Sequence, residues 1–368
     1  MSGTSALAGA IAAHGLPGAP ALPTVPLDDR EWPALLRLVT TERLVPVASY
    51  AADAGALAVT DAQREDLLAA HERAMSLVLV LERRLLEAYG ALRDAGVEVR
   101  VLKGPAVGRL DHPDPSWRAF GDVDLLVRGE SFDAAGRVLA DRGASRRFPE
   151  ARPGFDARFG KAVTYVGPDG LQIDLHRTFA TGVYGFAVDL DALFADAAAI
   201  SIGGTRLETL NREHRFLHAC FHAALGDEEP RLVALRDVAQ FVLATDLDLD
   251  AARHEAEAWG AGAVVARAVG LAWARLGLGP HPAAAWAAGR VATRRESRAL
   301  AAHTGRDRSY ASQVAAGVSA VPGITGKLAY VRALLLPDRR YLAGRDASYG
   351  ARLRRAWAAR RVVRGGAA

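Results

Sequence analysis

The sequence predicts an α+β protein in which a small mixed β-sheet lies between helical segments. Apolar residues recur every three or four positions before Ala95 and after Asn211, which is typical of helices. Between these positions they alternate every second residue in short runs separated by Gly and Pro, which is typical of strands. A chain of 368 residues is long enough for two or three packed units.

Four regions follow from these changes of period. Residues 1–27 carry prolines at steps of three from Pro17 to Pro26, which indicates a flexible, extended leader. Residues 28–95 form an N-terminal helical region, whose longest helix is expected from Ala62 to Ala95 behind an N-cap at Thr60. Residues 96–208 form the mixed core, and residues 209–368 form a helical C-terminal domain with a basic tail.

The individual elements of the last two regions can also be placed. We expect strands over 97–101, 122–127, 162–166, 171–175, 199–202 and 205–207, with hairpin turns at 167–170 and 203–204. Short helices are expected over 106–110 and over 132–141, the second capped by Ser131. Helices over 212–225, 232–244 and 251–276 then account for the apolar stripes of the C-terminal domain.

Charge and cysteine content narrow the class of protein. From Gly289 onward there are 17 Lys and Arg residues against 4 Asp and Glu residues, within a chain of net charge +4. Such a tail could meet RNA, a phosphate-rich ligand or an acidic partner, but a solvated helical face is the favoured interpretation because no aromatic-interleaved RNA motif accompanies it. One cysteine, Cys220, excludes an internal disulfide and a Cys-based zinc site. With no signal-peptide pattern and no long apolar run, we expect a cytoplasmic protein without membrane contact.

The clearest chemical signal is a pair of aspartates two residues apart. Asp122 and Asp124 point to one face of the expected strand 122–127. The aliphatic residues that alternate with them along the strand point to the other face. Asp174 lies on the polar face of the expected strand 171–175, so the three carboxylates converge if the two strands pair. Carboxylate oxygens suit Mg²⁺ or Mn²⁺, and two such ions can clamp a phosphoryl transfer, with Asp174 as candidate general base.

Phosphate-binding groups precede the aspartates. Gly104 lets the backbone approach an anion closely at the start of the expected helix 106–110, and Lys103 supplies a positive charge. Arg118 either neutralises the carboxylates or grips a phosphate through its planar guanidinium.

Histidines give weaker signals. His214, His218 and His222 share one helix face, which fits burial, a place in the substrate cleft or, least well, a metal site. His222 is the best cleft candidate of the three. His176 lies on the strand face of Asp174, where it either supports the site or faces solvent.

Together these residues resemble a family of uncharacterised bacterial nucleotidyltransferases in the DNA polymerase β-like superfamily. The likeness is carried by Leu102–Gly104, Arg118, Gly121–Val127 and Ile173–His176, and it extends over residues 30 to 345. It implies a nucleotidyltransferase core and transfer of an NMP from an NTP, expected to be ATP, to a hydroxyl acceptor with release of pyrophosphate.

The resemblance also assigns roles to residues. The expected catalytic and metal-binding residues are Asp122, Asp124 and Asp174, and the expected nucleotide-binding residues are Lys103, Gly104, Arg118 and Gly121. His176, His222 and Asp237 are candidates for the cleft, although Asp237 alone reads as a charge on a helix surface. The cofactor is expected to be Mg²⁺ or Mn²⁺.

One departure from the superfamily pattern keeps alternatives open. Most members carry Gly-Ser on the turn where this chain has Lys103 and Gly104, and the acidic pair follows after a shorter interval. The chain could therefore be a catalytically idle nucleotide-binding or scaffold protein. An RNA-directed transferase that uses the basic tail is a third interpretation. The sequence does not specify the acceptor, the base of the NTP or the oligomeric state.

Overall fold

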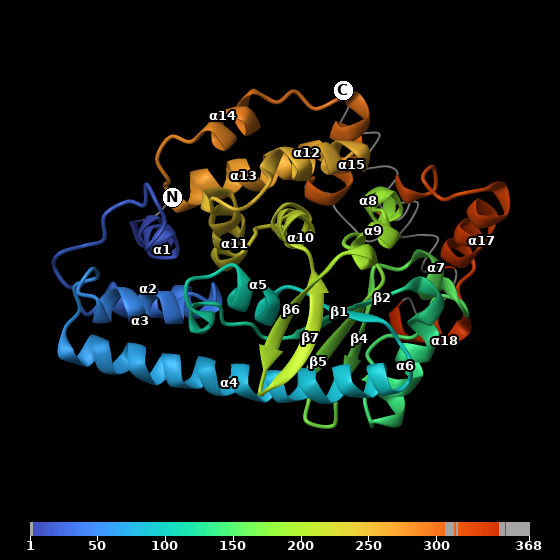
Figure 1. Cartoon of the computed structure of the whole chain (residues 1–368), viewed down its shortest axis with the longest axis horizontal. Helices are drawn as coiled ribbons and strands as arrows, with labels where there is room; N and C mark the ends of the chain where they lie inside the picture. Colours follow the sequence, from blue (N-terminus) through green and yellow to red (C-terminus); the bar gives the residue numbers. More distant parts are fainter. Residues whose placement is uncertain (1–2, 306–312, 314–315, 346–349, 351–368) are drawn as a thin grey trace.

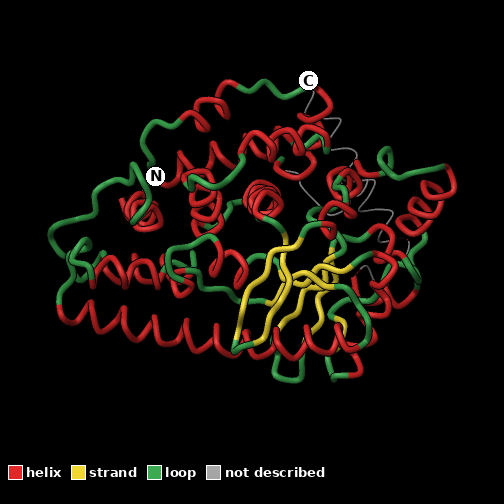
Figure 2. Tube along the Cα trace, viewed as in Figure 1, coloured by secondary structure: helices red, strands yellow, loops and turns green. Residues whose placement is uncertain are grey.

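A seven-stranded mixed sheet forms the centre of the fold, with strand order β3-β4-β5-β2-β1-β7-β6. The computed structural model describes residues 3–305, 313, 316–345 and 350. The strands are β1 (Val99–Val101), β2 (Val123–Val127), β3 (Ser145–Arg146), β4 (Ala162–Val166), β5 (Gln172–His176), β6 (Ala197–Ile202) and β7 (Thr205–Leu210). Strand β2 runs parallel to β5 and antiparallel to β1. The expected α+β class is confirmed (Figure 2).

Helices pack around this sheet and make up most of the chain before and after it (Figure 1). Those before the sheet are α1 (Gly3–Ala13), α2 (Trp32–Thr41), α3 (Val45–Asp53) and α4 (Asp61–Asp94). Those within the sheet region are α5 (Gly104–Leu110), α6 (Phe132–Asp141), α7 (Phe155–Phe159), α8 (Gly182–Ala187) and α9 (Leu190–Ala195), with 3₁₀ turns η1 (Pro115–Trp117) and η2 (Gly129–Ser131). Those after it are α10 (Arg212–Leu225), α11 (Leu232–Leu243), α12 (Leu249–Ala258), α13 (Gly262–Leu276), α14 (Pro282–Gly289), α15 (Arg294–Thr304), α17 (Ile324–Leu335) and α18 (Arg339–Arg345).

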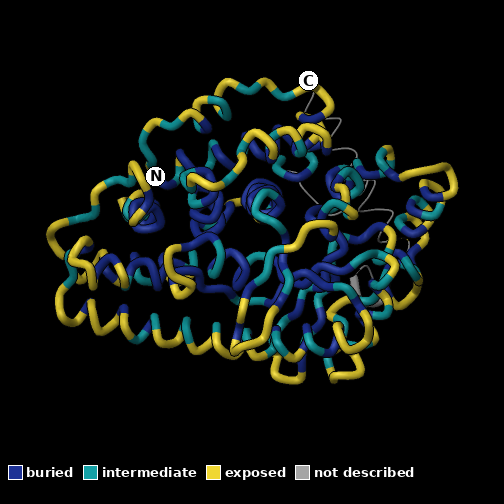
Figure 3. Tube along the Cα trace, in the orientation of Figure 1, coloured by how far each residue is buried: buried dark blue, intermediate teal, exposed yellow. Residues whose placement is uncertain are grey.

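The two faces of the sheet pack against different layers. Val123, Leu125 and Val127 of β2 belong to one apolar cluster with Leu81 and Leu85 of α4. Leu126, on the opposite face, belongs to the cluster that α10, α11 and α13 form. Figure 1 shows α4 on one side of the sheet and α10 on the other, and Figure 3 shows α10 buried while the outer side of α4 is exposed. The polar side chains of β2 therefore lie between the sheet and the helical half.

The expectation of a flexible leader was wrong. Residues 3–13 form helix α1, and Ile11 and Ala12 are fully buried in the helical core. Small side chains let this helix pack closely, since a Cβ at Gly9 would lie 2.2 Å from the Arg275 carbonyl oxygen. The Arg236 side chain also donates hydrogen bonds to the Ala12 and His14 carbonyls. Burial of small residues against a distant helix leaves no local periodicity to recognise.

Two further expectations need correction. The helix expected over 251–276 is two helices, because the chain turns at Gly260, whose φ is +63°. Ser131 makes no side-chain capping bond to α6, although α6 has the expected bounds. By contrast, the N-cap of the longest helix is confirmed, since Thr60 and Gln63 form a reciprocal capping box at the start of α4.

The expectations about the basic tail and about membrane contact can be compared only with the described residues. Much of the basic tail, residues 346–349 and 351–368, lies outside the described residues. No described helix is both long enough and apolar enough to cross a membrane.

Candidate active site

The strand pairing brings two of the expected carboxylates together. Asp124 of β2 lies directly opposite Asp174 of β5 in a parallel register. Their aliphatic neighbours turn into the α4 side of the sheet, so both carboxylates face the helical half, as the alternation predicts. Thr164, opposite Asp174 on β4, donates its hydroxyl to Asp174 Oδ1 at 2.6 Å.

Asp124 is buried between two nitrogen-bearing side chains. Its carboxylate is 3% exposed, and its Oδ1 lies 2.8 Å from Lys103 Nζ and 2.8 Å from His176 Nε2. Burial alone would raise the pKa of Asp124, but Lys103 and His176 together hold it well below the usual value. Asp124 is therefore an anion held in place by two donors.

The ligand atoms for a metal ion gather at the same point. One atom each from Asp124, Asp174 and His176 lies within 4.8 Å of the others. His176 Nδ1 is buried without a hydrogen-bond partner among the described residues, so the site has an unused polar atom. The two carboxylates suit Mg²⁺ or Mn²⁺, whereas an imidazole is more typical of Zn, Cu, Fe and Ni sites.

Asp122, the third expected carboxylate, lies outside this set. It precedes β2, its side chain is 33% exposed, and its Oδ1 lies 3.6 Å from a guanidinium nitrogen of Arg43. Arg43 belongs to the turn between α2 and α3, and its guanidinium would meet a Cβ placed at Gly121. A glycine at position 121 thus leaves room for the arginine beside Asp122.

One of the two roles expected for Arg118 was to neutralise this carboxylate cluster. The structure does not support that role. The Arg118 guanidinium donates to both oxygens of Asp237 on α11, with distances of 2.8 to 3.0 Å. His112 Nε2 lies 3.0 Å from the same carboxylate. Burial alone would raise the pKa of Asp237, but Arg118 and His112 lower it to about 2. Asp237, which alone read as a surface charge, is a buried anion that ties the sheet region to the helical half.

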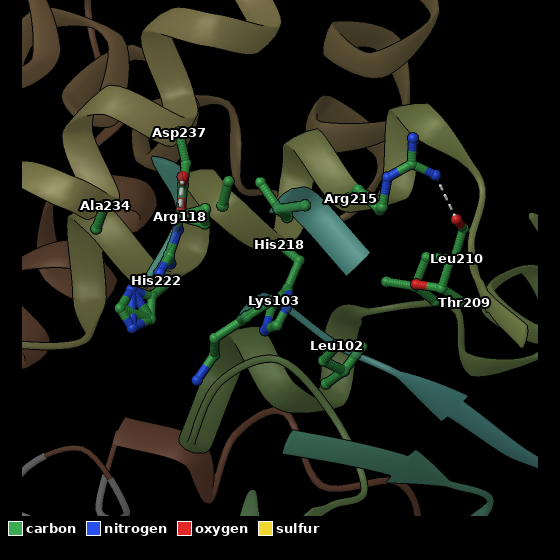
Figure 4. A pocket seen from close by; sticks show the side chains of 12 residues that line it. Leu102, Lys103, Arg118, Thr209, Leu210, Arg215, His218, His222, Ala234 and Asp237 are labelled. Atoms are coloured by element: carbon green, nitrogen blue, oxygen red, sulfur yellow. Dashed lines mark hydrogen bonds and ion pairs between the residues drawn. The ribbon is translucent and has the colours of Figure 1, made fainter. Parts of the chain in front are cut away.

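A cavity above the sheet joins these two groups (Figure 4). Its walls include Lys103, Arg118, His218, His222 and Asp237, and its free volume of about 10 Å³ is room for about one water molecule. Burial and then the charge of Lys103 hold the pKa values of His218 and His222 well below normal, so both imidazoles are neutral. His222 and His218 both line this cavity, whereas His214 pairs with Glu255.

The sequence-based reasoning missed one cation of the site. Lys161, which lies between α7 and β4, is half-buried, and no hydrogen bond or ion pair joins its Nζ to another described residue. Burial and then Lys103 lower the pKa of Lys161 to about 8, against the opposing effect of Asp124, Asp174 and Asp227. The signal was present, because the chain has only three lysines among its 46 basic residues.

The turn before the site has an unusual conformation. Lys103 has φ +44° and ψ −131°, a region in which residues other than glycine are strained. Gly104 follows it, and a Cβ at this position would lie 2.8 Å from the Phe120 ring. The turn is therefore closely packed and holds Lys103 in one place.

Two paired carboxylates thus lie on the interior strands β2 and β5 of a mixed sheet, with basic groups beside them. The chain belongs to the family described as uncharacterised nucleotidyltransferase, whose sequence profile matches residues 28–277. A search of curated proteins gave no match. Among solved structures, an antigenic nucleotidyltransferase-like protein from Paracoccidioides brasiliensis is similar, with a TM-score of 0.29 and 15% identity over 50% of this chain and 92% of that one.

Proposed function

We propose that the protein transfers a nucleoside monophosphate from an NTP, with ATP as the expected donor, to a hydroxyl of an acceptor, and that it does so in the cytoplasm with Mg²⁺ or Mn²⁺. The observation that carries the proposal is the juxtaposition of Asp124, Asp174 and His176 on two paired strands. Membership of a nucleotidyltransferase family supports it.

The reaction follows from the positions of these groups. The acceptor oxygen forms a bond to the α-phosphorus, the bond from that phosphorus to the bridging oxygen breaks, and pyrophosphate leaves. Asp174 accepts the hydroxyl proton at Oδ2, since Oδ1 is engaged by Thr164. Asp124 and Asp174, with Asp122 beside them, would hold a divalent ion, which would supply charge stabilisation at the phosphates.

Cationic side chains supply the phosphate contacts. The Lys161 ammonium has no hydrogen-bond or ion-pair partner among the described residues. Asp124 and Asp174 are close enough to attract it electrostatically. Gly104, which begins α5, and Gly121, which precedes Asp122, complete the proposed nucleotide contacts; Phe120 and Arg43 occupy the space that a Cβ would need at these two positions. Arg118 is not part of this proposal, because Asp237 engages its guanidinium.

The test uses α-labelled NTPs offered one at a time in a cell lysate. Label should pass from one of them to an acceptor with the wild-type protein, and Asp124→Asn and Asp174→Asn should lower the rate at least a hundredfold. Asp191→Asn, on a 91% exposed side chain, is the matched control and should leave the rate unchanged. Unchanged labelling with both active-site variants would contradict the proposal.

A catalytically idle nucleotide-binding protein is the second candidate. The ion pair of Lys103 with Asp124 favours it, because this pair occupies the turn on which the wider superfamily carries serine. Calorimetry separates the two candidates. Tight binding of Mg-ATP without release of pyrophosphate, with every acceptor fraction offered, would support the idle form. The RNA-directed alternative requires RNA binding that weakens steeply with salt and is lost when residues 289–368 are removed.

A further inference from the structure

The carboxylate cluster already contains a positive charge that the chain itself supplies. Lys103 Nζ lies 2.8 Å from Asp124 Oδ1, and the lysine side chain is only 17% exposed. The ammonium therefore forms an ion pair with Asp124 inside the cluster.

The backbone holds this ammonium in place. Lys103 is one of two residues other than glycine that have a positive φ within the described part of the chain. Hydrogen bonds fix the peptides on both sides, from Leu102 N to the Asp124 carbonyl at 3.0 Å and from Val107 N to the Lys103 carbonyl at 2.9 Å. Glycine would adopt this conformation without strain, so a lysine here indicates that its side chain is needed.

The hydrogen bonds of Asp124 limit how many ions it can hold. A carboxylate oxygen offers two lone pairs, and both those of Oδ1 are engaged, one by Lys103 Nζ and one by His176 Nε2. No hydrogen bond to Oδ2 is present among the described residues. Asp124 thus has one oxygen left for a metal ion and cannot bridge two ions through both of its oxygens.

The dimensions of the ligand set agree with this limit. Ligand atoms around one octahedral Mg²⁺ lie about 2.1 Å from the ion and therefore at most about 4.2 Å apart. The atoms from Asp124, Asp174 and His176 lie within 4.8 Å of one another, which a small adjustment brings into that range. Lys103 Nζ, 2.8 Å from Asp124 Oδ1, already places a positive charge beside this ligand set, and that charge repels a second cation.

We propose that this site binds a single divalent ion, through Asp124 Oδ2 and Asp174, and that the Lys103 ammonium takes the place of the second ion of a two-ion nucleotidyltransferase. Lys103 then faces the phosphates of the NTP as a fixed cation. This inference rests on the proposed function and specifies its cofactor stoichiometry.

The experiment counts Mn²⁺ ions on the full-length protein by electron paramagnetic resonance, with α,β-methylene-ATP present so that no transfer occurs. The wild-type protein should bind one ion per chain. Lys103→Gly removes the ammonium and suits the positive φ, so this variant should fold and bind two ions. Lys103→Met, which keeps the length of the side chain, should also bind two. Lys327→Met, on an exposed residue of α17, should bind one.

Each outcome decides between the possibilities. Two ions on the wild-type protein, or one ion on both Lys103 variants, would overturn the inference and leave the proposed transferase intact. Binding of no Mn²⁺ by the wild-type protein would overturn the metal-dependent function as well, so the two failures are distinguishable.

Discussion

The buried ion pair between Arg118 and Asp237 gives the sharpest prediction about stability. Replacing Asp237 by asparagine keeps the size of the side chain and removes its charge. The Arg118 guanidinium, which is 4% exposed, would then be a buried cation without a counterion. The anionic acceptor of His112 would be lost as well.

The magnitude follows from the contacts. Three donor–acceptor contacts of 2.8 to 3.0 Å join the two side chains, and removal of one partner from such a buried pair costs about 3–5 kcal/mol. The pKa of Asp237 is lowered to about 2 from its usual value of 3.8, and this shift accounts for about 2 kcal/mol of the cost. Loss of solvation by the unpaired arginine accounts for the rest.

The sign of the pH dependence can be stated. Because the folded-state pKa of Asp237 is depressed, its contribution is fully present above pH 4 and is lost as the pH falls through about 2. The wild-type protein should therefore lose its advantage over Asp237→Asn between about pH 4 and pH 2.

Urea unfolding followed by circular dichroism measures these free energies at pH 7 and at pH 3. Asp191→Asn removes the exposed partner of Arg128 and is the matched control, with an expected cost below about 1 kcal/mol. Equal costs for Asp237→Asn and Asp191→Asn at pH 7 would refute the reasoning. Replacing both partners, as in Arg118→Met with Asp237→Leu, should recover part of the loss.

Three further predictions concern single residues. Lys161→Met should raise the Kd for Mg-ATP about tenfold in calorimetry, equivalent to about 1.4 kcal/mol, while Lys327→Met leaves it unchanged; equal affinities would remove Lys161 from the phosphate site. Burial raises the pKa of the Cys220 thiol, so it should not react with a disulfide reagent at pH 7 until urea is added, and immediate reaction would contradict its burial. Gly104→Ala should lower the free energy of unfolding by about 1–3 kcal/mol, because the added Cβ meets Phe120, and a wild-type urea midpoint would show that the turn adapts.

Local patterns made the sheet and its carboxylates predictable. Residues 122–127 alternate between the two faces of β2 because a strand has a period of two, and that period alone places Asp124 opposite the aliphatic layer. Turn residues at 167–170 likewise predicted the hairpin of β4 and β5. The pairing of β5 with β2, which brings Asp174 beside Asp124, was only a condition of the prediction.

Contacts between distant segments were not predictable in this way. Arg118 and Asp237 are separated by 119 residues, so no spacing rule could pair them, and Arg118 was assigned to phosphates or to the nearer carboxylates instead. The burial of α1 depends on a complementary surface of α13, which no property of residues 3–13 reveals. The helix expected over 251–276 included Gly260, but the positive φ of this glycine separates two helices.

The same separation has a consequence during synthesis on the ribosome. A chain made at about 5–20 residues per second presents Arg118 roughly 6–24 s before Asp237, which lies 119 residues later, has been added. For most of that interval, until α10 has been made, the polar face of the sheet lacks its helical cover, and throughout it Arg118 has no counterion from α11. The site is therefore completed late in translation, and a nascent chain stalled before α11 would carry the carboxylates in an unfinished setting.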